Sequence, residues 1–200
     1  MTIPDTPNIY RQDELALAQR AAADNEVAMR QLADRLLNSV RTTVHYLSPK
    51  DAEADDMAQH AMIEILRSVH SFRGDCQLET WATRITVRTA IRHLKKRRSG
   101  LSWLEKLTHM PGEPSVSPEQ ISETYQLRRR VRHILGKLSL PQRTVLVLKL
   151  VHGFSIEEIA AATESPVNTV RERLRIARKK FRNYTLLDPV LSGWGEGRLS

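Results

Sequence analysis

Residues 155–183 read SIEEIAAATESPVNTVRERLRIARKKFRN, and this stretch predicts two short helices joined by a tight turn. Ser155 suits the N-cap of the first helix, because its hydroxyl can accept from an N–H group of the first turn. Two glutamates follow, where the helix dipole favours carboxylates. For the second helix, we expect Ser165 at the N-cap and Pro166 at the first position, where no N–H is needed. The stretch therefore predicts a helix-turn-helix.

The second of these helices has one apolar face and one cationic face. The apolar positions recur at helical spacing and predict a buried stripe: Val167, Val170, Leu174, Ala177 and Phe181. The opposite face carries Asn168, Thr169, Arg171, Glu172, Arg173, Arg175, Arg178, Lys179 and Arg182. Such a helix fits the major groove, with its first turns at base edges and its later cations near phosphates. The pattern favours DNA binding over the alternative, a solvated basic helix in an ordinary bundle.

The composition is that of a basic chain without a disulfide framework. The 200 residues carry a net charge of +8, and 40% of them are hydrophobic. A basic protein is drawn to nucleic acid or to anionic surfaces. The single cysteine, Cys76, is typical of a reducing compartment. The first residues lack a signal-peptide pattern, and no apolar run approaches the roughly 20 residues of a membrane span, so we expect a cytoplasmic protein without membrane insertion.

Helical periodicity covers most of the remaining chain, whereas no strand pattern or internal repeat is evident. We expect further helices over residues 13–23, 26–47, 51–69, 78–98, 118–138 and 140–152. Their expected buried residues are Leu32, Leu36, Val40, Val44, Leu47, Ala54, Met57, Ala58, Ala61, Ile65, Val69, Trp81, Ile85, Ala90, Ile91, Leu94, Ile121, Leu127, Val131, Ile134, Leu135, Val145, Leu146, Val147 and Leu148. The fold class expected from these patterns is all-α.

Proline, glycine and serine divide the helical chain into parts. They gather in residues 99–122, a composition typical of a flexible linker. The expected organisation is therefore two small helical domains, over residues 10–98 and 123–185, joined by this linker. Residues 186–200 contain Pro189 and several glycines, and we expect them to form a disordered tail.

Two segments carry a family resemblance when they are taken together. Residues 51–98 read DAEADDMAQHAMIEILRSVHSFRGDCQLETWATRITVRTAIRHLKKRR, and residues 140–183 read LPQRTVLVLKLVHGFSIEEIAAATESPVNTVRERLRIARKKFRN. They resemble domains 2 and 4 of the extracytoplasmic-function (ECF) sigma factors, the small sigma-70 superfamily subunits of bacterial RNA polymerase. The resemblance covers about residues 10 to 185. Asp56, Gln59, the FRG turn at residues 72–74 and Trp81 are its most specific features.

The resemblance implies a sigma factor that directs core RNA polymerase to specific promoters and helps to open them at transcription initiation. The implied partners are the β′ clamp helices and β flap of core RNA polymerase, promoter DNA and an anti-sigma protein. The resemblance assigns polymerase binding to Asp56, Gln59 and His60. His60 stands where the family usually has glutamate. An acidic helix face suits a basic partner surface, although carboxylates also favour any helix N-terminus.

The resemblance assigns the downstream (minus-10) promoter element to the turn after residue 71 and the helix that follows it. The implied contacts are Phe72, Arg73, Asp75, Cys76, Gln77, Leu78, Trp81, Arg84 and Arg88. Aromatic surfaces stabilise unstacked bases, and cations hold the single-stranded backbone. The alternative is that Phe72 and Trp81 fill the core; we favour it for Trp81 and leave it open for Phe72. Arg88 and Arg92 stand where the family often has Asn and Asp.

The upstream (minus-35) element is assigned by resemblance to the second helix of the helix-turn-helix. The matching positions are Ser165, Asn168, Thr169, Arg171, Glu172, Arg173 and Arg175. Arginine can bind guanine through two hydrogen bonds, asparagine suits adenine, and glutamate can accept from cytosine. Family members commonly carry glycine in place of Asn168 and a small residue in place of Glu172, so these two positions are expected to set individual preference. The expected phosphate contacts are Lys95, Lys96, Arg97, Arg98, Arg178 and Lys179.

Two other classes of function compete with this interpretation. The seven histidines are scattered without a zinc-ligand spacing, and no phosphate-binding glycine loop is present. We therefore expect no metal, no cofactor and no enzymatic activity. The other alternative is a stand-alone LuxR-type transcriptional regulator, because such proteins end in a very similar helix-turn-helix.

Overall fold

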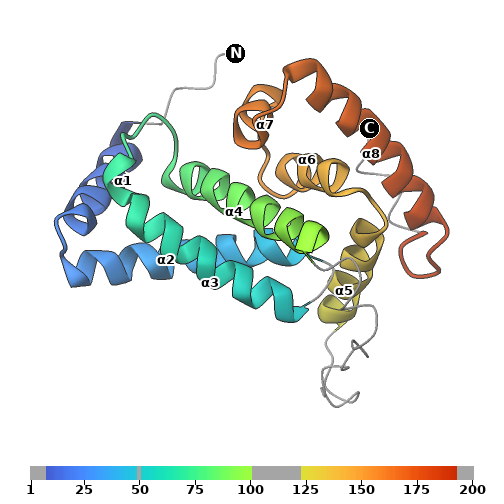
Figure 1. Ribbon diagram of the computed structural model, residues 1–200, viewed down its shortest axis with the longest axis horizontal. Coiled ribbons are helices and arrows are strands. Elements are labelled where there is room, and N and C mark those ends of the chain that lie inside the picture. Colours follow the sequence, from blue (N-terminus) through green and yellow to red (C-terminus); the bar gives the residue numbers. More distant parts are fainter. Residues whose placement is uncertain (1–7, 49–50, 101–122, 193–200) are drawn as a thin grey trace. The chain divides into compact units, whose positions relative to one another are not determined.

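The computed structural model describes residues 8–48, 51–100 and 123–192, and these residues form helices without a strand (Figure 1). The elements are α1 (Asn8–Ala22), α2 (Glu26–Leu47), α3 (Asp51–Ser68), the short 3₁₀ helix η1 (Val69–Ser71), α4 (Leu78–Gly100), α5 (Glu123–Gly136), α6 (Leu140–Leu150), α7 (Ile156–Thr163) and α8 (Val167–Leu186). The all-α class is thereby confirmed. Within the described residues, every helix is too short or too polar to cross a lipid bilayer.

The chain divides into two compact units, and the boundary between them falls inside α4, between Ala90 and Ile91. The first unit holds α1, α3, η1, α2 as far as His45 and the start of α4. The second holds the rest of α4 and the helices α5 to α8, together with residues 46–49. The predicted limits at 10–98, 99–122 and 123–185 stay predictions, and most of the predicted linker lies outside the described residues.

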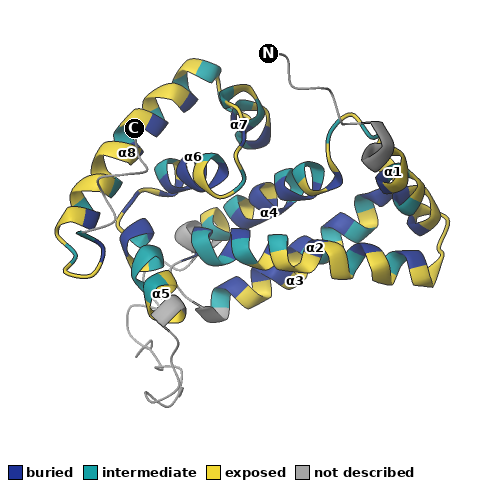
Figure 2. Ribbon diagram, turned by 180° about the vertical axis from the view of Figure 1, so that it is seen from behind, coloured by how far each residue is buried: buried dark blue, intermediate teal, exposed yellow. Residues whose placement is uncertain are grey.

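The core of the first unit follows the predicted faces of α2 and α3. All the residues expected to be buried over 26–47 and 51–69 are buried: Leu32, Leu36, Val40, Val44, Leu47, Ala54, Met57, Ala58, Ala61, Ile65 and, in η1, Val69. Of these, Leu47 belongs to the second unit. They recur at helical spacing as stripes along one side of each helix (Figure 2). Both predictions of buried faces are confirmed.

The predicted apolar face of α4 is wrong in most positions. Of the five residues expected there, Ala90 is buried, whereas Trp81, Ile85, Ile91 and Leu94 are only half-buried. The buried positions instead include the threonines Thr83, Thr86 and Thr89. A buried hydroxyl needs a hydrogen-bond partner, and Thr86 Oγ1 donates to the Ala82 carbonyl oxygen at 2.9 Å. Threonine thus fills core positions that a search for apolar residues passes over.

The core of the second unit is built on α6. The run from Val145 to Leu148 is buried as predicted, and it is joined by Ile159 of α7 and by Val170, Leu174 and Ala177 of α8. On α5, Ile134 and Leu135 are buried, whereas Leu127 and Val131 are half-buried and Ile121 lies outside the described residues. α8 packs against α6, α7 and α5, which fixes its apolar side and leaves its other side open.

The start of α7 is fixed by the predicted cap. The Ser155 hydroxyl accepts from the Glu158 N–H at 3.1 Å, and the Glu158 carboxylate accepts from the Ser155 N–H at 2.9 Å. This reciprocal pair is a capping box, and the prediction of Ser155 as N-cap is confirmed. The helix ends at Thr163, and the left-handed backbone of its C-cap, Glu164 (φ 50°, ψ 43°), turns the chain toward α8.

The predicted cap of α8 is wrong by one residue. Pro166 has an extended ψ of 143°, so it is itself the N-cap, and α8 begins at Val167. The Ser165 hydroxyl does not cap the helix but donates to the Thr163 carbonyl oxygen at 3.1 Å. The Ser165 hydroxyl oxygen also accepts from Arg173 at 2.8 Å, so Ser165 positions a side chain of the cationic face instead.

The predicted tail from residue 186 stays a prediction, and its first residues form a turn after α8. Asp188 accepts from the N–H groups of Val190 and Leu191 at 3.0 and 3.2 Å, and it pairs with Arg130 of α5 at 3.2 Å. Leu191 is only 3% exposed. Pro189, which the sequence suggested as a disorder signal, therefore lies in a turn that packs back on the unit, whereas residues 193–200, with the glycines, lie outside the described residues.

The contacts of Asp188 in this turn predict that the stability of the fold depends on pH. Burial would raise the pKa of Asp188, but the N–H groups of Val190 and Leu191, together with Arg130, outweigh it and hold the pKa below its ordinary value of 3.8. A lowered pKa stabilises the fold above this ordinary value, and the contribution disappears as the pH falls through the folded-state pKa. In thermal unfolding we expect Asp188→Asn to melt a few degrees below the parent at neutral pH and by a smaller margin at about pH 3. A gap of the same size at both pH values would contradict this assignment.

Candidate nucleic-acid interface

The polar face of α8 is organised by hydrogen bonds between its own side chains. Arg175 donates to both carboxylate oxygens of Glu172, from Nε at 2.9 Å and from NH2 at 2.7 Å. Arg171 donates to Asn168 Oδ1 at 3.2 Å and lies 3.9 Å from Glu157 of α7. Together with the bond from Arg173 to Ser165, these contacts give three of the arginines predicted to read bases a fixed acceptor. The face is thus preorganised, while Asn168, Arg171, Glu172 and Arg175 remain exposed.

The pair formed by Glu172 and Arg175 shifts the titration of both groups. The hydrogen bond from Arg175 lowers the pKa of Glu172, and the bond to Glu172 raises the pKa of Arg175. Both side chains lie in water, with 55% and 68% of their surfaces exposed, so the pair is open to exchange its partner for a base edge or a phosphate. Because Glu172 is ionised at neutral pH, it can accept hydrogen bonds but cannot donate them.

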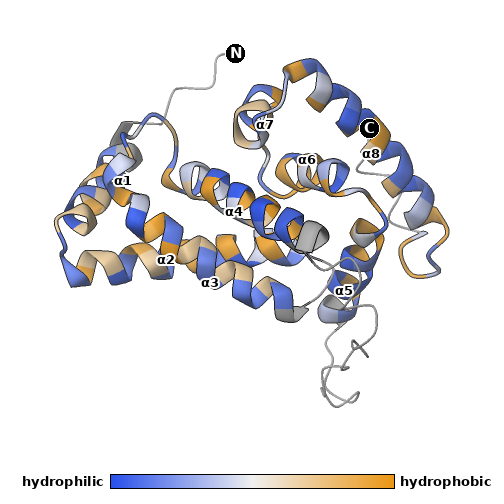
Figure 3. Ribbon diagram, in the orientation of Figure 1, coloured by the Kyte–Doolittle hydropathy of each residue, from blue (hydrophilic) through white to orange (hydrophobic). Residues whose placement is uncertain are grey.

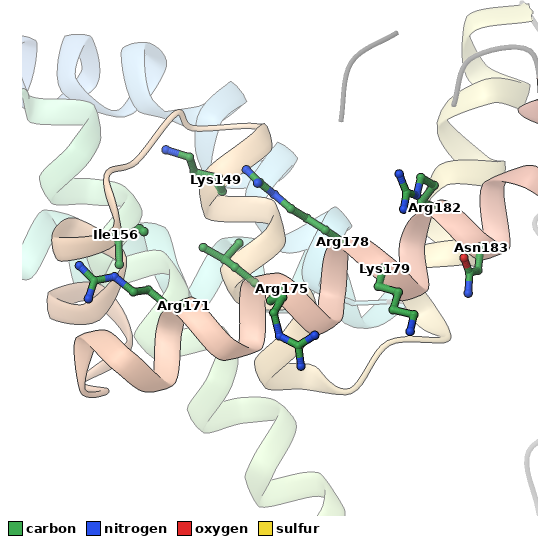
Figure 4. A pocket seen from close by; sticks show the side chains of 9 residues that line it. Lys149, Ile156, Arg171, Arg175, Arg178, Lys179, Arg182 and Asn183 are labelled. Carbon is green, nitrogen blue, oxygen red and sulfur yellow. The ribbon is translucent and has the colours of Figure 1, made fainter. Parts of the chain in front are cut away.

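A cationic hollow of about 510 Å³ lies along α8 between α6 and α7 (Figure 4). Its lining consists of Lys149, Ile156, Arg171, Leu174, Arg175, Arg178, Lys179, Arg182 and Asn183, without a carboxylate. Lys149 from α6 and Arg178 from α8 extend into the same space, whereas Arg175 and Lys179 project from the opposite side of α8 in this view. Figure 3 shows α8 as largely hydrophilic with hydrophobic residues at intervals, which is the pattern of an amphipathic helix with one solvent-exposed side.

Lys149 was missed by the sequence analysis. It belongs to α6, whose sequence gave only the signal of a buried helix, and its ammonium group donates to the Phe154 carbonyl oxygen at 3.0 Å. This bond places the charge beside the cations of α8. No spacing along the chain predicts it, because it depends on how α6 packs against α8.

The second candidate surface is the turn between η1 and α4. Phe72 and Leu78 are buried at its two ends, and Arg73, Asp75 and Gln77 between them are exposed. Cys76, in the same turn, is half-buried. The turn therefore presents three polar side chains on a segment that is anchored at both ends.

The two aromatic residues at this turn differ in burial, which decides the open question for Phe72 and goes against the expectation for Trp81. Phe72 is 7% exposed and belongs to the core, whereas Trp81, for which a core role was favoured, is only half-buried. Their ring centroids lie 5.5 Å apart at an angle of 57°. Phe72 thus supports one side of the indole, and part of the indole stays accessible.

Cationic side chains follow Trp81 along α4. Arg84 is half-buried, and Arg88, Lys95 and Lys96 are exposed. Trp81, Arg84 and Arg88 follow at spacings of three and four, which places them on one face of the helix. Arg97 and Arg98 belong to α4, but their side chains lie outside the described residues.

The predicted polymerase contacts lie together on α3. Asp56, Gln59 and His60 are exposed, and the Nδ1 atom of His60 lies 2.9 Å from the Asp56 carbonyl oxygen. Ile63, one turn further along α3, is 45% exposed, which the sequence analysis had not singled out. Asp55 is different, because it faces α2 and lies 3.6 Å from Arg41 and 3.7 Å from His45.

These surfaces define a class of protein: an all-α DNA-binding protein with a helix-turn-helix in the second unit and, in the first, an exposed polar turn followed by the start of a basic helix. Comparison with known families makes the class specific. The Sigma-70 region 2 family matches residues 32–100, and the Sigma-70, region 4 family matches residues 128–181. The chain belongs to the extracytoplasmic-function sigma factors, and it is an RNA polymerase sigma factor of transcription initiation.

Named relatives support the assignment over most of the chain. The ECF RNA polymerase sigma-E factor of Escherichia coli (strain K12) is 33% identical over 175 residues, which cover 84% of this chain and 91% of the relative. The RNA polymerase sigma-H factor of Pseudomonas aeruginosa is 35% identical over 135 residues, which cover 64% of this chain and 70% of the relative. The match to region 2 favours the sigma factor over a LuxR-type regulator.

Two solved structures have a similar fold. The sigma factor RpoE from Bartonella quintana, solved with the anti-sigma factor NepR, has a TM-score of 0.65 and is 22% identical; 80% of this chain and 97% of that chain are covered. CnrH, solved with the cytosolic domain of CnrY, has a TM-score of 0.62 and is 23% identical; 88% of this chain and 98% of that chain are covered.

Proposed function

We propose that the protein divides the work of a promoter-specificity subunit among three surfaces. The exposed face of α3 binds core RNA polymerase, α8 reads the upstream promoter element, and the turn at residues 72–78 with α4 reads and opens the downstream element. The observation that carries this proposal is that two separate units of a sigma factor each present a polar or cationic surface. The protein performs no covalent chemistry of its own, and it acts in the cytoplasm, where the polymerase works.

At the upstream element, the proposed readers are Ser165, Asn168, Thr169, Arg171, Glu172, Arg173 and Arg175. Fixed acceptors position three of the arginines before DNA arrives, which reduces the entropy lost on binding. Glu172 keeps one charge state at neutral pH and therefore favours a base that donates, such as cytosine, and disfavours a base edge that only accepts. Arg178 and Lys179, joined by Lys149, hold phosphates beside this helix.

At the downstream element, Arg73, Asp75 and Gln77 supply the polar contacts, and the accessible part of Trp81 stacks on an unpaired base. Phe72 supports this indole from the core rather than meeting the base itself. Arg84 and Arg88 follow the single strand along α4, and Lys95, Lys96, Arg97 and Arg98 meet the neighbouring duplex phosphates. Positive charge at Arg88 and Arg92 adds to this backbone attraction.

The proposed protein partners follow from exposed faces and from relatives. Asp56, Gln59 and His60 face the β′ clamp helices, and Ile63 adds an apolar contact on the same side of α3. The second unit docks on the β flap. An anti-sigma protein is proposed as a regulator, since the solved structure of RpoE is a complex with the anti-sigma factor NepR. The structure of CnrH is likewise a complex, with the cytosolic domain of CnrY.

Transcription from a promoter library with core polymerase and the purified protein tests the proposal. We expect core-dependent transcripts from a subset of templates that share two spaced elements. Templates selected with Glu172→Ala should lose their preference at one upstream position and keep the downstream element. Transcripts that start without regard to template sequence would contradict the assignment of promoter recognition.

A further inference from the structure

The carboxylate of Glu14 is a buried polar group outside every surface described above. Its side chain is 7% exposed, although Glu14 lies on α1, a helix outside the segment that matches Sigma-70 region 2. One of its oxygens accepts from the Leu78 N–H at 2.8 Å, across 64 positions of sequence, and the other pairs with Arg35 of α2. Burying a carboxylate is costly unless its oxygens are satisfied, and here each oxygen has a partner.

Leu78 is the first residue of α4, where a helix has N–H groups without a partner inside the helix. The Gln77 carbonyl oxygen accepts from the Trp81 N–H at 3.1 Å, so Gln77 occupies the N-cap position. Glutamine is not among the residues that cap helices well, whereas a carboxylate at this end is favoured by the helix dipole. Glu14 therefore supplies from another helix the acceptor that the local sequence lacks.

The same helix also supports the middle of the turn. Gly74 has a left-handed φ of +77°, and a Cβ atom built there would lie 3.7 Å from Leu15 Cδ2. The backbone of the turn thus runs close beside the Leu15 side chain. α1 packs in addition against η1, the element that leads into the turn. Three contacts from α1 accordingly reach the start, the middle and the end of the segment that carries Arg73, Asp75 and Gln77.

We propose that Glu14 is a positioning residue for the downstream promoter element. By fixing the Leu78 N–H, it sets where α4 begins and so holds the exposed side chains of the turn and the indole of Trp81 in the arrangement that binds an unpaired strand. Arg35 pairs with the other carboxylate oxygen and so aims the carboxylate at the helix end. This inference rests on the proposed role of the turn in reading the downstream element.

Three variants separate positioning from a general loss of charge or stability. Glu14→Ala removes the acceptor, Glu14→Gln keeps an oxygen that can accept from Leu78 but loses the charge, and Asp13→Ala removes a neighbouring, exposed carboxylate as the matched control. Amide hydrogen exchange of each full-length protein reports on the turn directly. Holoenzyme binding to a fluorescent single strand carrying the selected downstream element, to the upstream duplex and to core polymerase reports on function.

For Glu14→Ala we expect exchange at Leu78 to rise about fivefold or more, and affinity for the single strand to fall about five- to tenfold. Binding to the upstream duplex and to core polymerase should stay unchanged, Glu14→Gln should recover most of the loss, and Asp13→Ala should match the parent. Unchanged exchange and binding in Glu14→Ala would overturn the inference, and so would an equal loss in all three binding assays. If exchange rises but the parent holoenzyme ignores the single strand, the positioning contact stands and the proposed role of the turn fails.

Discussion

Arg173→Ala is expected to weaken promoter binding by about 5- to 150-fold on templates with the preferred upstream element, the range that one two-pronged base contact is worth. On templates with a substituted upstream element, the loss should be small, so the variant relaxes specificity. The reason is the hydrogen bond that Arg173 donates to the Ser165 hydroxyl, which aims the guanidinium from the first turns of α8 before DNA is bound. Holoenzyme binding to matched and mismatched duplexes measures the effect.

Lys180→Ala is the matched control, because Lys180 is an exposed cation of α8 outside the hollow. It removes the same charge and should change binding to both duplexes little and equally. Core binding should be unaffected in both variants, since Arg173 and Lys180 lie on α8 and not on the exposed face of α3 that is proposed to bind core polymerase. An equal loss by Arg173→Ala on matched and mismatched duplexes would assign Arg173 to phosphate instead of to a base.

Asp56→Arg is expected to weaken the complex with core RNA polymerase by about 30-fold or more, because placing like charges face to face costs several kcal/mol. Asp56 is exposed on α3, beside Gln59 and His60, so the charge reversal leaves the core of the first unit intact. The affinity of the labelled protein for core polymerase, measured at two salt concentrations, gives the result. The defect should be larger at low salt, where charges are screened less.

Asp34→Arg makes the same charge reversal at an exposed position of α2 and should bind core polymerase as the parent does. Asp55 would be a poor control, because it lies near Arg41 and His45 and its reversal disturbs the packing of α2 on α3. Equal loss of core binding by Asp34→Arg would show that net charge rather than the α3 face governs the complex.

Local patterns were sufficient for the elements whose signals lie within a few residues of each other. The stripes of α2 and α3 consist of aliphatic residues at helical spacing, and the cap of α7 is a serine three residues before a glutamate. In both cases one short segment contains all the residues that determine the feature. The exposed positions of Asn168, Arg171, Glu172 and Arg175 follow for the same reason, because the buried face of α8 leaves them on the other side.

The remaining features depend on contacts between residues that are distant in sequence, or on polar residues that can also pack in a core. Thr86 of α4 packs in the core because its hydroxyl donates to a carbonyl oxygen of the same helix, and no polarity scale predicts this burial. Asp188 orders the turn after α8 through Arg130, 58 positions away, and Lys149 joins the cations of α8 only through packing. Glu14 and Leu78 form the extreme case, since a helix end that lacks a good local cap gives no hint of which residue replaces it.

The most direct test of the account is whether this protein needs core RNA polymerase to hold promoter DNA. The measurement is the affinity of the purified protein for a duplex carrying both selected elements, with and without core polymerase. We predict tight core binding and retention of the duplex only in the ternary complex, and we expect Asp56→Arg to lose both. Tight binding of the duplex by the protein alone, together with indifference to core polymerase, would contradict it.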